Sequence, residues 1–228
     1  MRLREAEIEI RAGQTDREVV IRVWVDANRP VIFVEAQGRK PFNARAELDM
    51  WRTKQRVLQG REAFSARGLT RDSYKIIVYP DVIVPGTKDC IIWYHHNRVS
   101  AWPITMKVQG LASLMKRFAD PLLGRTFGGL IRGTGLVRVS DTALASAGPR
   151  RNHLVWICAL TEHPASPEQW QQQLLRLARR IEAKPLEQAR SAHRRWWAEF
   201  WDRSWLRLSG SPQLREVSRR YALQRFIN

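Results

Sequence analysis

The sequence predicts a mainly β fold that is followed by helices in its C-terminal part. From Leu3 to about Leu160, apolar and polar side chains alternate with a period of two, which is typical of strands with one buried face. After Pro164 the apolar residues recur with a helical period instead. Many strands that are separated by turn residues, with almost no helix between them, indicate a large antiparallel sandwich.

The early strands are predicted from rows of alternating residues. They cover residues 6–10, 19–25, 31–34 and 44–50, with a turn at 26–30. In the first row, Ala6, Ile8 and Ile10 alternate with glutamates. We therefore expect the apolar row to be buried, and we expect acidic residues to occupy mostly exposed strand positions.

The later strands are predicted at residues 74–79, 90–94, 130–139 and 153–160. Residues 111–118 predict one short helix, and residues 120–129 predict an ordered loop that leads into a strand. The Gly128-Gly129 pair and the Gly133-Thr-Gly135 segment resemble phosphate-binding loops. However, no Gly-Lys-Ser/Thr follows them and no third glycine opens a helix, so we expect bends or bulges in a strand.

Three helices are predicted at the C-terminal end. Ser166, Pro167 and Gln169 have the order of a capping box with proline at the first helical position, and the first helix follows them. Its apolar stripe comprises Trp170, Leu174, Leu177 and Ile181. Pro185 separates it from a tryptophan-rich second helix, and Pro212 opens a third helix that reaches the end of the sequence at Asn228.

Composition argues against several classes of protein. The net charge is +17, which suits anionic partners, but the arginines and lysines are scattered and no nucleic-acid-binding motif accompanies them, so nucleic acid is an unlikely partner. No apolar stretch is long enough to cross a bilayer and the N-terminus lacks a signal core, so we expect no membrane partner. Cys90 and Cys158 both lie in apolar runs, and the sequence leaves their pairing open.

The segment most suggestive of a ligand site is the strand end at Trp93, Tyr94, His95, His96 and Asn97. Two imidazoles, an amide and two aromatic rings can bind a polar ligand such as a sugar, although a structural role for most of them is the main alternative. Adjacent histidines on a strand point to opposite faces, so we expect no metal site there.

Other residue types give no clear catalytic site. His193 has neighbours suited to packing, and the cluster of Trp196, Trp197, Trp201 and Trp205 has the spacing of a seam between helix and sandwich, although it could also form a sugar platform. No local pattern nominates a Ser-His-Asp triad. A pair of glycosidase carboxylates cannot be chosen either, so we assign no catalytic residue and no cofactor.

Five segments together resemble a known bacterial family. They are VWVDANRPVIFVEA (23–36), IIWYHHN (91–97), DPLLGRTFGGLIRG (120–133), HRRWWAEFWDRSW (193–205) and YALQRFI (221–227). They are similar to the domain-of-unknown-function family 5703. Those proteins look like relatives of glycoside hydrolases of families 95 and 65.

The resemblance implies an N-terminal β-supersandwich that linker helices join to an (α/α)6 barrel. It places the supersandwich at residues 1–163, the helical linker at 164–210 and the first barrel helix at 211–228. It also implies that Arg125 faces the sugar cleft with Trp93 to Asn97, and that the catalytic acid and base lie in a barrel beyond Asn228. The first strands would precede Met1.

We therefore expect a truncated fragment, inactive by itself, whose partners are carbohydrate and the missing barrel. The family resemblance also suggests an exported protein, although the chain itself carries no signal peptide. Two alternatives remain. One is a free-standing carbohydrate-binding or interaction module that uses exposed tryptophans, and the other is nucleic-acid binding through the basic surface.

Overall fold

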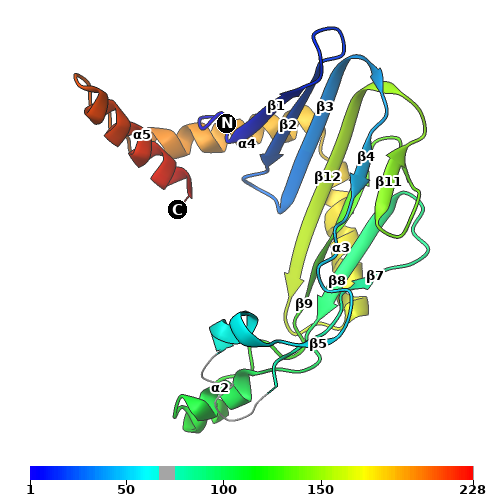
Figure 1. The fold of residues 1–228 in the computed structure, drawn as a ribbon, viewed down its shortest axis with the longest axis vertical. Coiled ribbons are helices and arrows are strands. Elements are labelled where there is room, and N and C mark those ends of the chain that lie inside the picture. Colours follow the sequence, from blue (N-terminus) through cyan, green and yellow to red (C-terminus); the bar gives the residue numbers. More distant parts are fainter. Residues whose placement is uncertain (67–74, 228) are drawn as a thin grey trace. The chain divides into compact units, whose positions relative to one another are not determined.

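The computed structural model describes residues 1–66 and 75–227 of the chain, and it confirms a mainly β fold with C-terminal helices (Figure 1). The strands are β1 (Glu7–Ala12), β2 (Val19–Val25), β3 (Val31–Phe42), β4 (Arg45–Glu47), β5 (Arg56–Val57), β6 (Ile77–Val78), β7 (Val82–Ile83), β8 (Cys90–His96), β9 (Thr126–Gly133), β10 (Leu136–Arg138), β11 (Ala143–Ser146) and β12 (Arg150–Glu162). The helices are η1 (Gly60–Ala66), α2 (Trp102–Val108), η2 (Ala112–Lys116), α3 (Pro167–Glu182), α4 (Leu186–Asp202) and α5 (Pro212–Ile227).

Hydrogen bonds join the strands into sheets of different sizes. The largest sheet has the order β1-β2-β3-β12-β9-β8-β7, and a smaller one has the order β10-β11-β4. The chain also divides into two compact units. Unit 1 comprises residues 1–43, 148–156 and 179–228, and unit 2 comprises residues 44–147 and 157–178. The division into a supersandwich, a linker and a first barrel helix stays a prediction.

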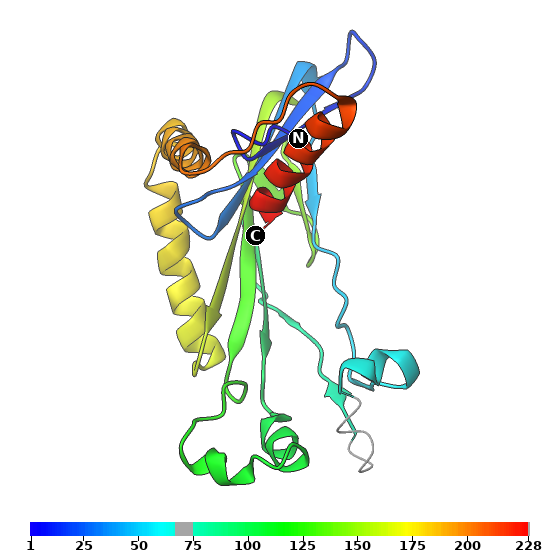
Figure 2. The same cartoon turned by 90° about the vertical axis from the view of Figure 1, so that its left-hand side faces the viewer.

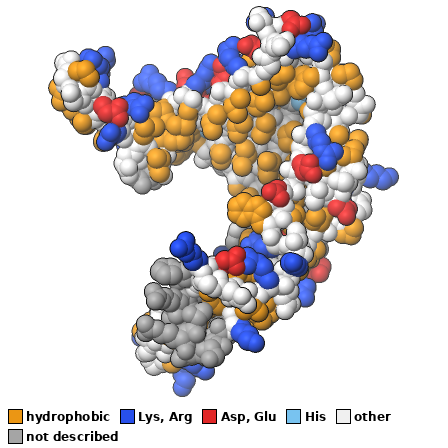
Figure 3. All heavy atoms as spheres, viewed as in Figure 1, with side chains coloured by type: hydrophobic (Ala, Val, Ile, Leu, Met, Phe, Trp, Pro, Cys, Tyr) orange, Lys and Arg blue, Asp and Glu red, His pale blue; other side chains and the backbone are white. Residues whose placement is uncertain are grey.

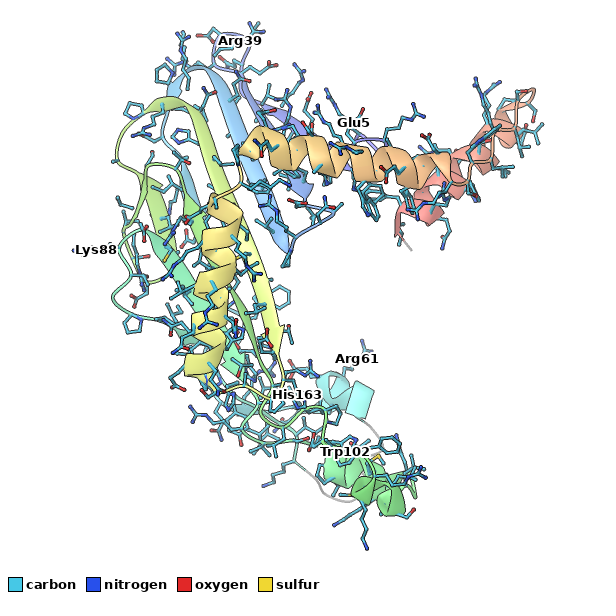
Figure 4. All side chains as sticks on the ribbon, turned by 180° about the vertical axis from the view of Figure 1, so that it is seen from behind. Glu5, Arg39, Arg61, Lys88, Trp102 and His163 are labelled. Atoms are coloured by element: carbon cyan, nitrogen blue, oxygen red, sulfur yellow. The ribbon has the colours of Figure 1, made fainter. Side chains whose placement is uncertain are left out.

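Unit 1 has its core between β1 to β3 and helix α4. The three strands are antiparallel, and Trp24 of β2 lies opposite Phe33 of β3, with ring centroids 4.5 Å apart. On the helix, His193 contacts the Trp24 ring at a centroid distance of 4.9 Å. Figure 4 views the helix from the side where it covers these strands, with Glu5 labelled beside it. Large rings and one imidazole therefore fill the space between the helix and the sheet.

Strand β1 buries the face that its sequence predicts to be exposed. Glu7 is buried, with 3% of its surface exposed, whereas Ile8 and Ile10 are exposed. The Glu7 carboxylate is ion-paired with Arg190 of α4 at 3.3 Å and with Arg22 of β2 at 3.6 Å. Because this pairing compensates the loss of water around the carboxylate, Glu7 can face the helix. The expected burial of Ile8 and Ile10 is wrong.

The second face of these three strands is apolar and only partly covered. It carries Ile8, Ile10, Ile21, Val23 and Val25, which are half-buried or exposed. Figure 3 shows hydrophobic side chains gathered over this face of the strands. A contiguous apolar face of this kind is a feature of interaction surfaces.

Unit 2 is built on β7, β8 and β9, with the end of β12 and most of α3. Strand β8 pairs antiparallel with residues 126–132 of β9, and β10 and β11 of the smaller sheet also contact β8. Ile91, Ile92 and Leu130 of this pair are fully buried. Figure 2 shows α3 running along one side of these strands. Trp170 of α3 donates a hydrogen bond from its indole nitrogen to the carbonyl of Leu160, 3.0 Å away.

The two glycines that resemble a phosphate loop lie inside β9. A Cβ on Gly128 would lie 2.1 Å from the carbonyl oxygen of Trp93, and a Cβ on Gly129 would lie 2.6 Å from the carbonyl oxygen of Cys158. Any side chain at these positions would collide with the backbone of a neighbouring strand. The glycines are needed because the strands approach closely. They belong to a strand, as expected, but the pairing of β9 with β8 runs through both of them without the expected bulge.

The start of α3 confirms the capping box. The amide of Gln169 donates to Oγ of Ser166 at 3.3 Å, and the amide of Ser166 donates to Oε1 of Gln169 at 3.0 Å. Trp170, Leu174, Leu177 and Ile181 are all buried, as the apolar stripe predicts. Pro185 ends the break before α4, and α5 begins at Pro212.

Several elements differ from their predicted extent. The strand expected at 44–50 is shortened to Arg45–Glu47, and the strand expected at 74–79 is shortened to Ile77–Val78. Helix α2 begins within the Ala-Trp-Pro sequence at 101–103, and its helical character was not predicted. Tyr74 and Asn228 lie outside the described residues. Over residues 1–66 and 75–227, no helix has both the length and the apolar character needed to span a bilayer.

Candidate ligand site in unit 2

The pairing of β8 with β9 sorts the residues of the predicted site onto two faces. His95 lies opposite Phe127, and Trp93 lies opposite Gly129. Because side chains alternate along a strand, Trp93, His95 and Asn97 belong to one side of β8, and Tyr94 and His96 belong to the other. The structure therefore divides a segment that the sequence treats as one group.

A hollow of about 440 Å³ lies on the first of these sides. We call it the β8–β9 hollow. Its lining residues are Arg52, Lys75, Ile76, Ile77, Val78, Tyr79, His95, Asn97, Val99, Ser100, Ala101, Leu122, Arg125 and Phe127. Of the six predicted residues, His95, Asn97 and Arg125 line the hollow, whereas Trp93, Tyr94 and His96 do not.

A carboxylate behind the hollow orients His95. Oδ1 of Asp81 lies 2.8 Å from Nδ1 of His95 and 2.7 Å from Nε of Arg52. Because a carboxylate only accepts hydrogen bonds, Nδ1 of His95 carries the proton that it donates. Nε2 is then the ring nitrogen that can bind a ligand. Asp81 also neutralises the charge of Arg52, so this pair adds little net charge to the site.

Phe127 forms an aromatic part of the lining, and two neighbours contact its ring. The guanidinium carbon of Arg52 lies 5.4 Å from the ring centroid, and the His95 ring centroid lies 5.3 Å away at an interplanar angle of 39°. Arg52 therefore makes a cation–π contact in addition to its ion pair. These contacts hold both polar side chains in place around the phenyl ring.

The other polar side chains come from the turn between β8 and β9 and from the loop before β9. Nε and Nη2 of Arg125 both donate to the carbonyl of Pro121, at 3.0 and 2.9 Å. Asn97 donates from Nδ2 to the carbonyl of Leu122 at 3.1 Å, and its backbone amide donates to the carbonyl of Arg125 at 2.9 Å. Arg125 and Asn97 are thus fixed to the same loop.

Asp120 holds this loop in shape. Its Oδ1 accepts hydrogen bonds from the amides of Leu122 and Leu123, at 2.8 and 3.1 Å, and from Oγ of Ser100 at 2.9 Å. Burial by itself would raise the pKa of Asp120, but these hydrogen bonds lower it below its ordinary value. The loop is therefore organised around an ionised carboxylate.

The second side of β8 faces α3. Tyr94 contacts the buried Trp170 at a centroid distance of 5.7 Å. Nδ1 of His96 lies 2.8 Å from Oγ1 of Thr126, whose hydroxyl donates to the carbonyl of Ala165. Burial, with help from the nearby Arg98, lowers the pKa of His96. Tyr94 and His96 are therefore placed as packing residues.

Trp93 is placed beside the glycine of the neighbouring strand. A Cβ on Gly129 would lie 2.8 Å from the far edge of the Trp93 ring, so the indole occupies the space that a side chain at 129 would need. The small residue opposite Trp93 therefore gives the indole its position.

Sequence reasoning missed Arg52, Asp81 and Phe127, which hold or border His95. None of these three belongs to a local motif with the strand end. The one signal available was the alternation in β9, since Phe127 occupies the position opposite His95. Arg52 and Asp81 are brought in by the tertiary fold.

The aromatic cluster of α4 contacts other parts of unit 1. The indole nitrogen of Trp201 donates to the carbonyl of Leu3 at 3.0 Å, and Trp197 contacts Phe226 of α5 at a centroid distance of 5.2 Å. Trp205, by contrast, is 75% exposed. Three of the four predicted tryptophans therefore pack, while Trp205 extends into solvent.

The two cysteines and the possible metal ligands form no further candidate site among the described residues. Cys90 and Cys158 are both buried and form no disulfide with each other, and burial raises the pKa of Cys90. Across the described ranges, 1–66 and 75–227, no group of three or more His, Cys, Asp or Glu residues is arranged to hold a metal ion.

The fold and the site thus define a mainly β chain with C-terminal helices and a polar hollow beside one strand pair. The family profile of the N-terminal part of DUF5703, a domain of unknown function, matches residues 1–206, so the chain belongs to this family. A comparison with curated proteins found no match.

Among solved structures, the chain is similar to a putative kojibiose phosphorylase from the human microbiome. The identity is 6% and the TM-score is 0.46. The similarity covers 87% of this chain and 24% of that one, so the chain spans about a quarter of the length of that protein.

Proposed function

We propose that this chain is the non-catalytic N-terminal part of a glycoside-hydrolase-like protein, and that the β8–β9 hollow binds part of a carbohydrate. Membership of the DUF5703 family, whose proteins resemble glycoside hydrolases, supports the first part of the proposal. The volume of about 440 Å³ supports the second, because small-molecule sites in proteins commonly have this size.

The residue types that line the hollow support the proposal that this part of the protein is non-catalytic. Glycosidases cleave with two carboxyl groups that flank the scissile bond, about 5 to 10 Å apart. Within the described part of the chain, the lining of the hollow contains no Asp or Glu. Asp81, which lies behind His95, is already paired with Arg52 and His95. Groups for binding are thus present, whereas a pair for cleavage is lacking among these residues.

The polar lining suits sugar hydroxyls. Nε2 of His95 accepts a hydrogen bond in the neutral ring, while Arg125 and Asn97 have donors beyond those that fix them to the loop. The apolar face of β1 to β3 also supports the view that the chain works with a further domain, since such faces mark interaction surfaces. In the proposed whole protein, that domain is the (α/α)6 barrel and it supplies the catalytic groups.

A calorimetric titration with neutral and acidic oligosaccharides tests this function. We expect saturable binding of at least one sugar by the chain, without release of reducing ends. His95→Ala should weaken that binding about tenfold or more because it removes the acceptor in the hollow. His96→Ala, one residue away on the face toward α3, should leave the affinity unchanged. Equal losses in both variants, or no binding of any sugar, would contradict the proposal.

A second candidate function is a free-standing carbohydrate-binding module that uses exposed tryptophans. Trp51 and Trp205 favour it, because they are 89% and 75% exposed and a bare indole can stack on a sugar ring. Under this alternative, Trp51→Ala or Trp205→Ala would abolish binding and His95→Ala would leave it intact.

A further inference from the structure

The lining of the β8–β9 hollow differs from that of a site for neutral sugars. Neutral sugars commonly bind by stacking on an open aromatic face. The aromatic side chains that line the hollow, within the described residues, are Phe127, Tyr79 and His95. Phe127 already contacts Arg52 and His95, which occupy space around its ring. Stacking on Phe127 is therefore restricted.

The charges of the hollow are unbalanced. Arg52, Lys75 and Arg125 line it, and two carboxylates in the described part of the chain contact this lining. Asp81 is paired with Arg52, and Asp120 accepts hydrogen bonds from Ser100 and from the amides of Leu122 and Leu123. No carboxylate of the described residues forms an ion pair with Lys75 or Arg125. Among the described residues, the cationic charge of these two side chains is thus not neutralised by an ion pair and is available to an anionic ligand.

Arg125 is also prepared for such an anion by its geometry. The edge of its guanidinium formed by Nε and Nη2 is bound to the carbonyl of Pro121. This leaves Nη1 and the second hydrogen of Nη2, which together form the end-on edge of the group. That edge can bind two oxygens of one carboxylate or sulfate. Because the loop around Asp120 already fixes the side chain, binding costs little additional ordering.

We infer that the β8–β9 hollow recognises an acidic sugar, with the negatively charged substituent on the end-on edge of Arg125 and near Lys75. The substituent is a uronate carboxylate or a sulfate ester, which present the same pair of oxygens. Hydroxyl groups of the same sugar would bind His95 and Asn97. This inference rests on the proposed carbohydrate site and assigns a substrate class to it.

Matched sugars test the inference by nuclear magnetic resonance titration of the chain at an ionic strength of about 0.15 M. The probes are methyl glucuronide, methyl glucoside and glucose 6-sulfate, with methyl galacturonide and methyl galactoside as a second pair. We expect at least one charged sugar to bind about tenfold more tightly than its neutral partner. Preference for the uronate or for the sulfate identifies the source of the charge.

Variants separate the site from general attraction to a basic protein. Arg125→Gln should remove the preference for the charged sugar, and Arg125→Lys should retain part of it because the charge remains without the bidentate edge. Arg176→Gln is the matched control, since Arg176 is an exposed arginine on α3 of the same unit. For Lys75→Gln the control is Lys88→Gln; Lys88, labelled in Figure 4, lies in the loop between β7 and β8.

The outcomes distinguish failure of this inference from failure of the proposed function. Equal affinities for charged and neutral sugars would overturn the acidic-sugar inference and leave the carbohydrate site standing. No binding of any sugar would overturn both. A preference that survives Arg125→Gln, or that Arg176→Gln removes equally, would also overturn the inference. Binding of inorganic sulfate as tight as that of the charged sugars would overturn it too, because the sugar ring would then contribute nothing to the affinity.

Discussion

Asp81 and Glu7 illustrate how single residues gain their roles from distant partners. Asp81 fixes the tautomer of His95 from 14 positions away in the sequence. Glu7 is buried because Arg190, 183 positions away, compensates its charge. The partner of each residue lies far away in the sequence. The alternation of polar and apolar residues in β1 therefore predicts that Glu7 is exposed to solvent. These are the residues for which sequence reasoning fails, because long-range ion pairs reverse a local pattern.

His193 offers a test at the same scale. Its Nδ1 accepts from the amide of Ala27 at 3.2 Å, and its Nε2 donates to the carbonyl of Glu5, 2.9 Å away. The ring is therefore neutral, and burial lowers its pKa. The expectation that His193 has packing neighbours and satisfied hydrogen bonds agrees with this arrangement.

The pH dependence of stability follows from that lowered pKa. Below the unfolded pKa of about 6.5, the unfolded chain binds a proton that the folded chain resists, so the stability from His193 is present above that pH and is lost as the pH falls through the folded pKa. We expect His193→Gln to lower the free energy of unfolding by about 1 to 3 kcal/mol at about pH 7.5 and by less at about pH 5. Urea denaturation at both pH values measures this. A loss of equal size at both would contradict the neutral, buried imidazole.

At the scale of elements, the starts of α3, α4 and α5 were predictable and the short strands were not. The capping box of α3 is encoded by three neighbouring residues, and the proline positions fix the breaks before α4 and α5. Strands β5, β6 and β7 have two residues each, which is too short for any period to be seen. Helix α2 was missed because its 7 residues span only about two turns, which is too short for a helical period to be seen.

The capping box gives the prediction at this scale. Ser166→Ala removes the acceptor for the Gln169 amide at the start of α3 and should lower the free energy of unfolding by about 1 kcal/mol. The matched control is Ser191→Ala, an exposed position inside α4, where alanine favours the helix and stability should not fall. Thermal and urea unfolding of both variants provide the comparison. If Ser166→Ala left the free energy of unfolding unchanged, the cap would contribute nothing to stability and the prediction would be wrong.

The candidate site was predictable in part at the element scale. The sequence predicted a candidate ligand site at the end of β8, and His95, Asn97 and Arg125 do line a hollow there. The sequence did not show which face of β8 lies toward α3, because that face is set by the packing of Tyr94 against Trp170. Whether these residues bind a sugar stays a prediction.

For the molecule as a whole, the net charge says less about possible partners than the distribution of the charged side chains does. The net charge of +17 is large, but many arginines belong to ion pairs, including those with Glu7, Asp26 and Asp81. On the face that Figure 3 shows, lysine and arginine side chains are dispersed and do not form a continuous stripe. This distribution is unlike the clustered basic surface of nucleic-acid-binding domains. It is compatible with a local cationic site in unit 2.

The central claim is that carbohydrate binds in the β8–β9 hollow, and a map of chemical-shift changes during a titration with the tightest-binding sugar tests it most directly. The account predicts saturable changes concentrated at His95, Asn97, Arg125 and Phe127, with the signals of Trp51 and Trp205 unchanged. Changes confined to those two tryptophans would contradict the account and support the free-standing module. An absence of changes anywhere would contradict both.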